Sequence, residues 1–279
     1  MKAKITTLAE NTASGGGVLG EWGLSILVET GEATVLLDTG GPELSAAHNA
    51  HRLGKDLSAV EKIVLSHGHF DHTGGLVEML NRIKKPVEII AHPQIWAQKY
   101  AKVPNRSERY IGVPFPRQMI ESMGAIFSLT ADPVKISDNI MTTGEIEIQT
   151  DYEEIDDFLF EKRDEKWVPD TVPDDLSLII RTDSGLAVIT GCAHRGIINT
   201  LRHAQKLTGI DHIHTVIGGI HLFRASEERL ALTVADLHEF GIQRLGVSHC
   251  TGQLAAAQLA QEFGDTFFFN NAGTSLVID

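Results

Sequence analysis

The sequence predicts an α/β fold in which strands and helices alternate along much of the chain. Short apolar runs of strand length recur, each bounded by Gly, Asp, Asn or Pro. Apolar residues at helical spacing lie between several of these runs. The expected strands are Leu24–Val28, Thr34–Leu37, Lys62–Leu65, Val87–Ala91, Leu176–Ile180, Leu186–Ile189 and His214–Ile217.

Three segments have the apolar periodicity of an amphipathic helix. Residues 76–83 place apolar side chains at i, i+3, i+4 and i+7, which gives a single buried face. Residues 230–237 repeat this spacing, with Ser226 as the expected N-cap. The third helix is expected at Leu254–Phe263 and should end before Gly264.

Length and composition indicate a globular protein rather than a membrane or disulfide-rich one. The chain has 279 residues, 42% of them hydrophobic, and a mean hydropathy of −0.03. The first residues do not read as a signal peptide, and no apolar run is long enough to cross a membrane. The cysteines Cys192 and Cys250 are too few for a disulfide framework. We therefore expect a single domain, residues 1–279, in the cytoplasm and without membrane contact.

The charge is strongly negative and unevenly distributed. A formal charge of −13 argues against binding nucleic-acid phosphates, so nucleic acid is not an expected partner. Residues 151–175 are especially acidic. This segment is either a solvated, mobile surface loop or, with its aromatic residues, a lid or a dimer arm. The surrounding region, about residues 92–175, has the least regular pattern and reads as an insertion or lid over the site.

The strongest chemical signal is the run SHGHFDHTGG at residues 66–75. It follows the apolar run Ile63-Val64-Leu65 and places His67, His69, Asp71 and His72 within a short loop. Imidazole and carboxylate groups are ligands for divalent ions, and a loop at a strand end can direct several of them at one point. The loop predicts a site for one or two divalent metal ions, and Zn²⁺, Mn²⁺ and Fe²⁺ are all compatible with these ligand types. The alternative is a polar loop without a metal.

The His-x-His-x-Asp-His pattern resembles the signature of the metallo-β-lactamase superfamily. Further motifs agree with it: LLDTG at residues 36–40, which looks like the early strand whose Asp, here Asp38, supports the site, TGCAH at 190–194 and SHCTG at 248–252. Together with GGIHL at 218–222, the last two are similar to a subgroup related to 7,8-dihydropterin-6-methyl-4-(β-D-ribofuranosyl)aminobenzene-5′-phosphate synthase. The resemblance implies a four-layer αββα sandwich with its metal site at one edge, between the two halves.

The resemblance also implies a ligand set. His67 and His69 would hold a first ion together with a later residue, for which His194 is the candidate. Asp71, His72 and His249 would hold a second ion. For His194 and His249 the alternative is a histidine at a helix start or strand end that binds no metal. In redox di-iron relatives a Glu stands where this chain has His69, which favours a hydrolytic, zinc-like site.

The chain departs from the family pattern at the next positions. Many members have a ligand His before a later strand and a bridging Asp at its end. Here Asp174 and Asp175 precede that strand, and Cys192 follows it. Asp174 or Asp175 could replace the usual ligand, and Cys192 could be a ligand, a supporting group or a core residue. Relatives of the subgroup often carry His where this chain has Trp22, which argues against a catalytic role for that loop.

The expected function is a metal-dependent hydrolase, or a dihydropterin synthase-like enzyme, that uses a metal-activated water on a small phosphorylated or ester-type substrate. Asp71 would orient the water, and His221 would bind substrate or transfer a proton, unless its role is structural. Arg195 and Arg224 are the nearest candidates for phosphate contacts. The alternatives are a non-catalytic metal-binding sensor and a nuclease. The protein could form a homodimer.

Overall fold

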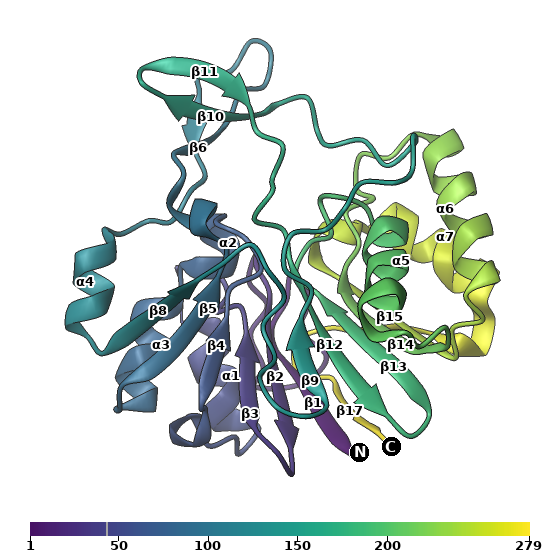
Figure 1. The fold of residues 1–279 in the computed structure, drawn as a ribbon, viewed down its shortest axis with the longest axis horizontal. Coiled ribbons are helices and arrows are strands. Elements are labelled where there is room, and N and C mark those ends of the chain that lie inside the picture. The colour runs from purple at the N-terminus through teal and green to yellow at the C-terminus, as the bar shows by residue number, and fades with distance from the viewer. Residues whose placement is uncertain (43) are drawn as a thin grey trace.

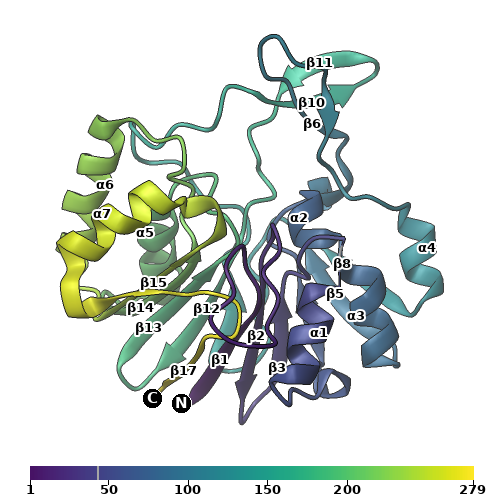
Figure 2. The ribbon, with the colours of Figure 1, turned by 180° about the vertical axis from the view of Figure 1, so that it is seen from behind.

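The computed structural model describes residues 1–42 and 44–279, and it confirms the four-layer αββα sandwich. Two large sheets face each other in the middle, and helices cover the outer face of each (Figure 1). Seen from behind, the two termini lie together at the end of the sandwich away from helix α2 (Figure 2). Helix α2 (Phe70–Thr73) belongs to the histidine-rich loop.

The first sheet has seven strands in the order β17-β1-β2-β3-β4-β5-β8. Its strands β3, β4, β5 and β8 run parallel, so their carboxyl ends meet at one edge. The bounds are β1 (Ala3–Ala9), β2 (Ser25–Thr30), β3 (Thr34–Leu37), β4 (Lys62–Val64), β5 (Val87–Ala91), β8 (Ala125–Leu129) and β17 (Ser275–Ile278).

The second sheet has six strands in the order β16-β15-β14-β13-β12-β9. Strands β13 to β16 are parallel neighbours, so their carboxyl ends also share one edge. The bounds are β9 (Ile140–Thr142), β12 (Ser177–Thr182), β13 (Gly185–Thr190), β14 (Ile213–Gly219), β15 (Arg244–Ser248) and β16 (Phe267–Phe269).

Side chains from the facing sheets form one buried cluster between them, in which Ile26 and Val64 of the first sheet join Ile189 and Ile217 of the second. Strands buried on both faces need apolar residues on both, which explains why these strands read as continuous apolar runs and do not alternate. The outer helices are α1 (Ser45–Arg52) and α3 (Leu76–Ile83) on the first sheet, and α5 (Ile197–Thr208), α6 (Glu227–Glu239) and α7 (Gln253–Phe263) on the second.

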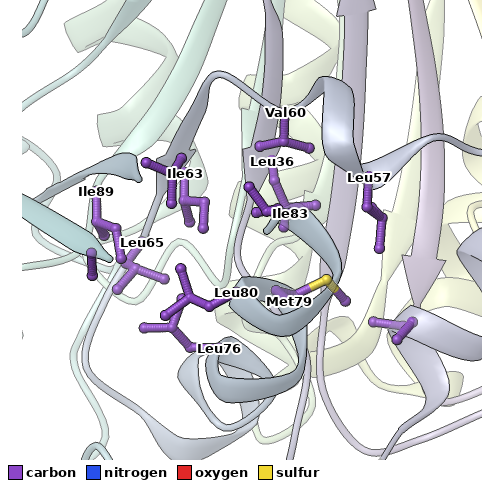
Figure 3. Close-up of a cluster of buried hydrophobic side chains, with 14 of the residues drawn as sticks. Leu36, Leu57, Val60, Ile63, Leu65, Leu76, Met79, Leu80, Ile83 and Ile89 are labelled. Carbon is purple, nitrogen blue, oxygen red and sulfur yellow. The ribbon is translucent and has the colours of Figure 1, made fainter. Parts of the chain in front are cut away.

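Helix α3 packs as its apolar spacing predicts. Leu76, Met79, Leu80 and Ile83 are each at most 3% exposed, and they pack in one cluster with Leu36, Ile63 and Ile89 of the first sheet and with Leu65, which directly follows β4 (Figure 3). The helix directly follows the histidine loop. Its packing therefore fixes the carboxyl-terminal end of that loop against the sheet.

Most expected elements are present with small shifts at their ends. Strands β3 and β5 have the predicted bounds, and α6 begins after Ser226, whose Oγ accepts a hydrogen bond from Arg229 N at 3.1 Å. Strand β1 lies buried between β17 and β2. It was not predicted, because the polar residues Thr6 and Thr7 interrupt the apolar pattern expected of a buried strand.

A third, four-stranded sheet in the order β11-β10-β6-β7 projects above the sandwich (Figure 1). It contains β6 (Lys99–Ala101), β7 (Arg109–Tyr110), β10 (Leu159–Arg163) and β11 (Lys166–Pro169), while α4 (Arg117–Ser122) lies beside β8. The acidic segment is therefore not simply a solvated loop. It supplies two of these strands and several buried carboxylates: Glu153, Glu161, Asp170, Asp174 and Asp175.

A fully buried ion cluster joins the third sheet to the histidine loop. Lys99 Nζ donates to Asp170 Oδ2 and to Asp174 Oδ1, both at 2.8 Å, and all three side chains are 0% exposed. Although burial disfavours the charge, Asp174 and Asp170 hold the pKa of Lys99 above its ordinary value. The other oxygen of Asp174 accepts the backbone N–H of Gly68, between His67 and His69, at 2.7 Å.

Within residues 1–42 and 44–279, no helix has both the length and the apolar character needed to cross a membrane.

We predict that Lys99→Met destabilises the protein by about 3–5 kcal/mol, because it leaves two buried carboxylates without their counter-ion. Denaturant unfolding measures this change. Lys135→Met is the matched control, since Lys135 pairs with Asp138 on the surface, where both side chains are at least 67% exposed. Its cost should stay below about 1 kcal/mol. Equal losses in both variants would contradict the role given to Lys99.

Candidate metal centre

The candidate ligands follow the carboxyl ends of parallel strands in both sheets. His67 and His69 follow β4, while Cys192 and His194 follow β13 and His249 follows β15. Because the two sheets face each other, these loops meet at one edge of the sandwich, next to helix α2 (Figure 1). The structure thus brings together every metal ligand predicted from the sequence.

His67, His69 and His194 form the first group. Ring centroids are 4.5 Å apart for His67 and His69, 4.8 Å for His67 and His194, and 4.9 Å for His69 and His194. The Nε2 atoms of His67 and His69 and both ring nitrogens of His194 are buried without a hydrogen-bond partner among the described residues. Buried polar atoms are rarely left unsatisfied, so these nitrogens indicate a bound group.

Asp71, His72 and His249 form the second group. His249 Nε2 lies 3.3 Å from His72 Nε2 and 3.3 Å from Asp71 Oδ2. The ring of His67 lies 4.2 Å from that of His72, so the two groups adjoin. The side chains of the two ligand sets expected from the family resemblance therefore form two adjoining groups.

Cys192 lies between the two groups. Its Sγ is 3.1 Å from His72 Nε2. It belongs to one set of potential ligand atoms with His67 and His194, and to another with His72 and His249, and within each set all atoms lie within 4.8 Å of one another. Among the alternatives left open by the sequence, this placement favours a ligand over a core residue.

Asp38 fixes the orientation of the histidine loop, as the LLDTG motif suggested. Its carboxylate accepts hydrogen bonds from Ser66 N and Ser66 Oγ at 2.7 Å each. Its Oδ2 also lies 2.7 Å from His72 Nδ1, which leaves Nε2 of His72 facing the second group. Such carboxylate–histidine pairs orient the ring of a metal ligand.

His249 is held by residues that the sequence did not point to. Glu10 Oε1 accepts the backbone N–H of His249 at 2.8 Å, and Asn11 Oδ1 lies 2.9 Å from His249 Nδ1. Both residues follow β1 directly. The strand itself was not predicted, so nothing in the sequence linked these residues to the site.

The structure separates the roles of Asp174 and Asp175. Both oxygens of Asp174 are engaged, by Lys99 and by Gly68, so Asp174 supports the loop and is not available as a ligand. Asp175 Oδ2 accepts the backbone N–H of Arg195 at 2.9 Å, whereas its Oδ1 is buried with no partner among the described residues. Burial raises the pKa of Asp175 to about 7.

His221 lies inside the cluster, with 6% of the residue exposed. Its ring centroid is 4.0 Å from that of His194, and its Nε2 lies 2.8 Å from Asp156 Oδ2. Burial opposes protonation, but the hydrogen bond to Asp156 raises the pKa of His221 to about 9. His221 has a φ of 47°, a strained value for a residue with a side chain, and such strain often marks functional sites.

Trp22 contacts the site, although the sequence argued against a catalytic role for its loop. Its indole Nε1 donates to Asp71 Oδ2 at 2.8 Å, and its ring centroid lies 5.0 Å from that of His249. The adjacent Gly23 has a φ of 151°, and a Cβ there would lie 2.4 Å from Asp71 O. The loop and Asp71 are therefore closely fitted.

The electrostatics of the first group suit metal binding. Burial, together with neighbouring histidines, lowers the pKa values of His67 and His194. Burial and Lys99 lower that of His69. These rings are neutral at pH 7, the form that binds metals. In the second group, burial opposes protonation of His72, but Asp38 outweighs it and raises the pKa of His72 to about 9. Burial would raise the pKa of Asp71, but hydrogen bonding to His249 outweighs it and lowers the pKa of Asp71.

The donor set therefore fits one or two divalent ions. Unpartnered buried ring nitrogens, a carboxylate and a thiol converge from both sheets. Nitrogen, oxygen and sulfur donors together are typical of zinc, and they also accommodate other first-row metals.

The comparisons agree with this geometry. A family model described as the metallo-beta-lactamase superfamily matches residues 23–232. The chain belongs to the metallo-β-lactamase superfamily. It is also 34% identical, over 97% of its length and 95% of the relative's, to a Methanocaldococcus jannaschii protein named 7,8-dihydropterin-6-methyl-4-(beta-D-ribofuranosyl)-aminobenzene-5′-phosphate synthase. This similarity confirms the subgroup that the motifs suggested.

Two further proteins are similar to this chain over nearly its whole length. An uncharacterized protein of Methanocaldococcus jannaschii is 33% identical over 92% of this chain and 94% of its own. A crystal structure described as a metal-dependent hydrolase of the β-lactamase superfamily is 28% identical, with a TM-score of 0.85 over 98% of both chains. Family membership and the relative named as a synthase support a metal-dependent enzyme.

We predict a pH-dependent stability difference between the metal-free protein and its Asp175→Asn variant. Between about pH 4 and pH 7, folded Asp175 keeps its proton while the unfolded chain loses it, so the native protein loses stability as the pH rises. The variant lacks this loss. The free energy of unfolding of the variant, minus that of the wild-type protein, should rise by about 1.4 kcal/mol per pH unit over this range and level off above pH 7. Denaturant unfolding at a series of pH values tests this, and parallel curves would contradict it.

Proposed function

We propose that the protein is a metal-dependent hydrolase with two adjoining ion positions. His67, His69 and His194 would hold one ion, and Asp71, His72 and His249 the other. The observation that carries the proposal is the group of buried, unpartnered ring nitrogens on His67, His69 and His194, because such atoms are costly unless they bind something. Zn²⁺ is the proposed metal, with Mn²⁺ or Fe²⁺ as alternatives.

A divalent ion bound here would polarise a phosphoryl or carbonyl oxygen and lower the pKa of a bound water toward about 7. The residues supply orientation and proton transfer. Trp22 and His249 hold Asp71 Oδ2 in place, so Asp71 is positioned to orient the attacking water. With Nε2 engaged by Asp156 and a pKa of about 9, His221 is suited to donate a proton to the leaving group.

We further propose that Cys192, as a thiolate, is a ligand between the two ion positions. Its sulfur lies among the ligand atoms of both groups, at the end of β13, where many family members carry a bridging carboxylate. Burial raises the pKa of the free Cys192 thiol. Metal binding would therefore have to displace the Cys192 proton.

The proposed substrate is a small phosphorylated or ester-type molecule. A cavity of about 640 Å³ has a lining that includes Asp156, Arg224 and Arg229. Asp156 connects the cavity to the centre, because it also contacts His221. Arg195 is a weaker candidate for binding phosphate, since Glu145 accepts its Nη1 hydrogen bond at 2.9 Å. Arg224 is the remaining candidate, with its guanidinium over the ring of Phe158.

A second candidate is the synthase activity in the name of the Methanocaldococcus jannaschii relative. The 34% identity over 97% of this chain favours it. That name describes a product with a reduced pterin and a ribosyl phosphate, which matches the proposed small phosphorylated substrate. A metal centre that activates a phosphate ester could serve either reaction.

We predict that protein purified without added metal contains about one to two divalent ions per chain, measured by elemental analysis. His67→Ala/His69→Ala should lose at least one ion and melt at a lower temperature, because metal binding contributes to folding free energy. His48→Ala/His51→Ala, which alters two histidines of α1, is the matched control and should keep its metal. Metal-free protein that is equally stable in chelator would contradict the proposed centre.

The enzyme proposal is tested with a panel of phosphomonoesters, phosphodiesters and carboxylic esters in the presence of Zn²⁺ or Mn²⁺. We predict turnover that Asp71→Asn lowers at least 100-fold, since this change removes the oriented carboxylate. Metal binding without turnover on the panel or in a pterin-coupling assay would instead indicate a sensor. Salt-dependent RNA or DNA cleavage would indicate a nuclease.

The role of Cys192 is tested with Co²⁺-substituted protein. Native protein should show a thiolate-to-cobalt charge-transfer absorption, because the sulfur would bind the ion directly. Cys192→Ser should lose this absorption and keep the visible bands of histidine-bound cobalt. Cys250→Ser is the control and should retain the absorption. An identical spectrum for Cys192→Ser and native protein would rule out the ligand role.

A further inference from the structure

Three buried side chains with metal-binding atoms lie just beyond the ends of three adjacent parallel strands. Cys192 follows β13, His221 follows β14 and Cys250 follows β15. Their potential ligand atoms all lie within 4.8 Å of one another, and each residue is at most 6% exposed. His221 and Cys250 belong to neither ion group of the proposed hydrolytic centre, so the three residues form a separate set of donors that shares Cys192 with that centre.

The middle strand has no side chain between the two cysteines. Gly219 is the last residue of β14, and a Cβ there would lie 2.6 Å from Cys250 Sγ and 3.2 Å from Cys192 Cα. Cys250 Sγ therefore lies against the Cys192 backbone, where it donates to Cys192 O at 3.4 Å. Glycine at this position allows sulfur atoms from the two outer strands to approach each other across the middle strand.

His221 has a free ring nitrogen beside the two sulfurs. Its Nε2 is engaged by Asp156 Oδ2 at 2.8 Å, whereas its Nδ1 is buried with no hydrogen-bond partner among the described residues. Buried polar atoms rarely stay unpaired. A carboxylate on one ring nitrogen is also the contact that commonly orients an imidazole ligand, because it fixes the direction of the other nitrogen. His221 is thus oriented to bind a group next to the sulfurs.

The backbone of the three loops is strained at or beside each donor. Ala193, His221 and His249 have φ values of 54°, 47° and 50°, in the left-handed region that residues with side chains rarely adopt. Ala193 directly follows Cys192, and His249 directly precedes Cys250. Such strain persists only where the surrounding structure imposes it, and it clusters at functional sites. The fold therefore holds the three donors close together.

Two thiols and one imidazole make a softer set of donors than either group of the proposed hydrolytic centre, where histidine and carboxylate predominate. Soft thiolate ligands favour Cu(I). A zinc–sulfur bond is about 2.3 Å long, and with bonds of this order one ion can contact two sulfurs that lie within 4.8 Å of each other. The single charge of Cu(I) also repels neighbouring divalent ions less than a third divalent ion would.

We propose that Cys192, His221 and Cys250 form a third metal position, which binds a soft monovalent ion, Cu(I). Both cysteines bind as thiolates, and the proton of the Cys250 thiol passes to solvent. His221 binds through Nδ1, while Asp156 holds its Nε2. This position goes beyond the proposed function, because it uses a different set of donors and a different class of ion, and its occupancy does not require turnover.

The test is anaerobic titration of the zinc-loaded protein with Cu(I) against a competing colorimetric chelator, with zinc release measured in the same samples. Native protein should bind about one Cu(I) ion per chain and keep its zinc. Cys250→Ser and His221→Gln should each weaken Cu(I) binding at least about 100-fold, because losing a ligand costs more than losing an outer contact. Asp156→Asn removes only such a contact and should weaken binding about 10- to 100-fold.

His203→Gln is the matched control. His203 is also a buried histidine whose Nδ1 lacks a partner among the described residues, but it lies on α5 and its Nε2 contacts Thr143 O at 3.2 Å. Its imidazole is not part of the sulfur-containing donor set. This variant should therefore bind Cu(I) as native protein does.

X-ray absorption at the copper edge supplies a measurement that does not depend on the folding of any variant. The native complex should show both sulfur and nitrogen neighbours for copper. Four results would overturn the proposal: no Cu(I) binding by native protein, copper without sulfur neighbours, zinc release in step with Cu(I) binding, or native affinity in Cys250→Ser. These results are distinct from failure of the proposed function, which would appear as absence of zinc or of turnover in copper-free protein.

Discussion

The buried carboxylate of Asp38 is the constraint on which the metal centre depends. It binds Ser66 through both backbone and side chain and holds His72 through Nδ1, while Ser66 Oγ also lies 2.8 Å from His67 Nδ1. One side chain on the first sheet thereby orients ligands of both ion groups. Gly191, from the second sheet, packs directly on this network, and a Cβ there would lie 2.1 Å from Ser66 Oγ and 2.8 Å from Asp38 Oδ2. The close packing of the two sheets and the geometry of the metal centre therefore depend on the same residues.

The sequence predicted those features that are local. The histidine loop, helix α3 and strands β3 and β5 each carry their signal within a few adjacent residues, and the family motifs added His194, His249 and Asp38. Features that depend on contacts between distant segments were not accessible. Asn11 supports His249 only because β1 lies in the middle of the first sheet, and Trp22 reaches Asp71 only because its loop folds over that residue.

The acidic segment shows why summed charge is a poor guide to individual side chains. Its composition suggested a solvated loop, yet Asp170 and Asp174 surround the buried Lys99, and Glu153 accepts the backbone N–H groups of Ile198 and Asn199 at the start of α5. A carboxylate at a helix start is stabilised by the unpaired N–H groups and the helix dipole. These carboxylates have structural partners, whereas Asp151, Glu154, Asp157 and Glu228 beside the cavity are exposed, and composition cannot distinguish the two kinds.

The ligands come from two distant parts of the chain. One set follows β4 of the first sheet and consists of His67, His69, Asp71 and His72. The other set lies in the second sheet, where Cys192 and His194 follow β13 and His249 follows β15. An ion shared by these groups would cross-link the two layers, in addition to the apolar packing and hydrogen bonds that already join them. During synthesis the first sheet's ligands emerge long before their partners, so the nascent chain could hold metal only weakly until β15 has been made. Full metal binding would then require that the two halves have packed together, so a bound ion would indicate completed folding.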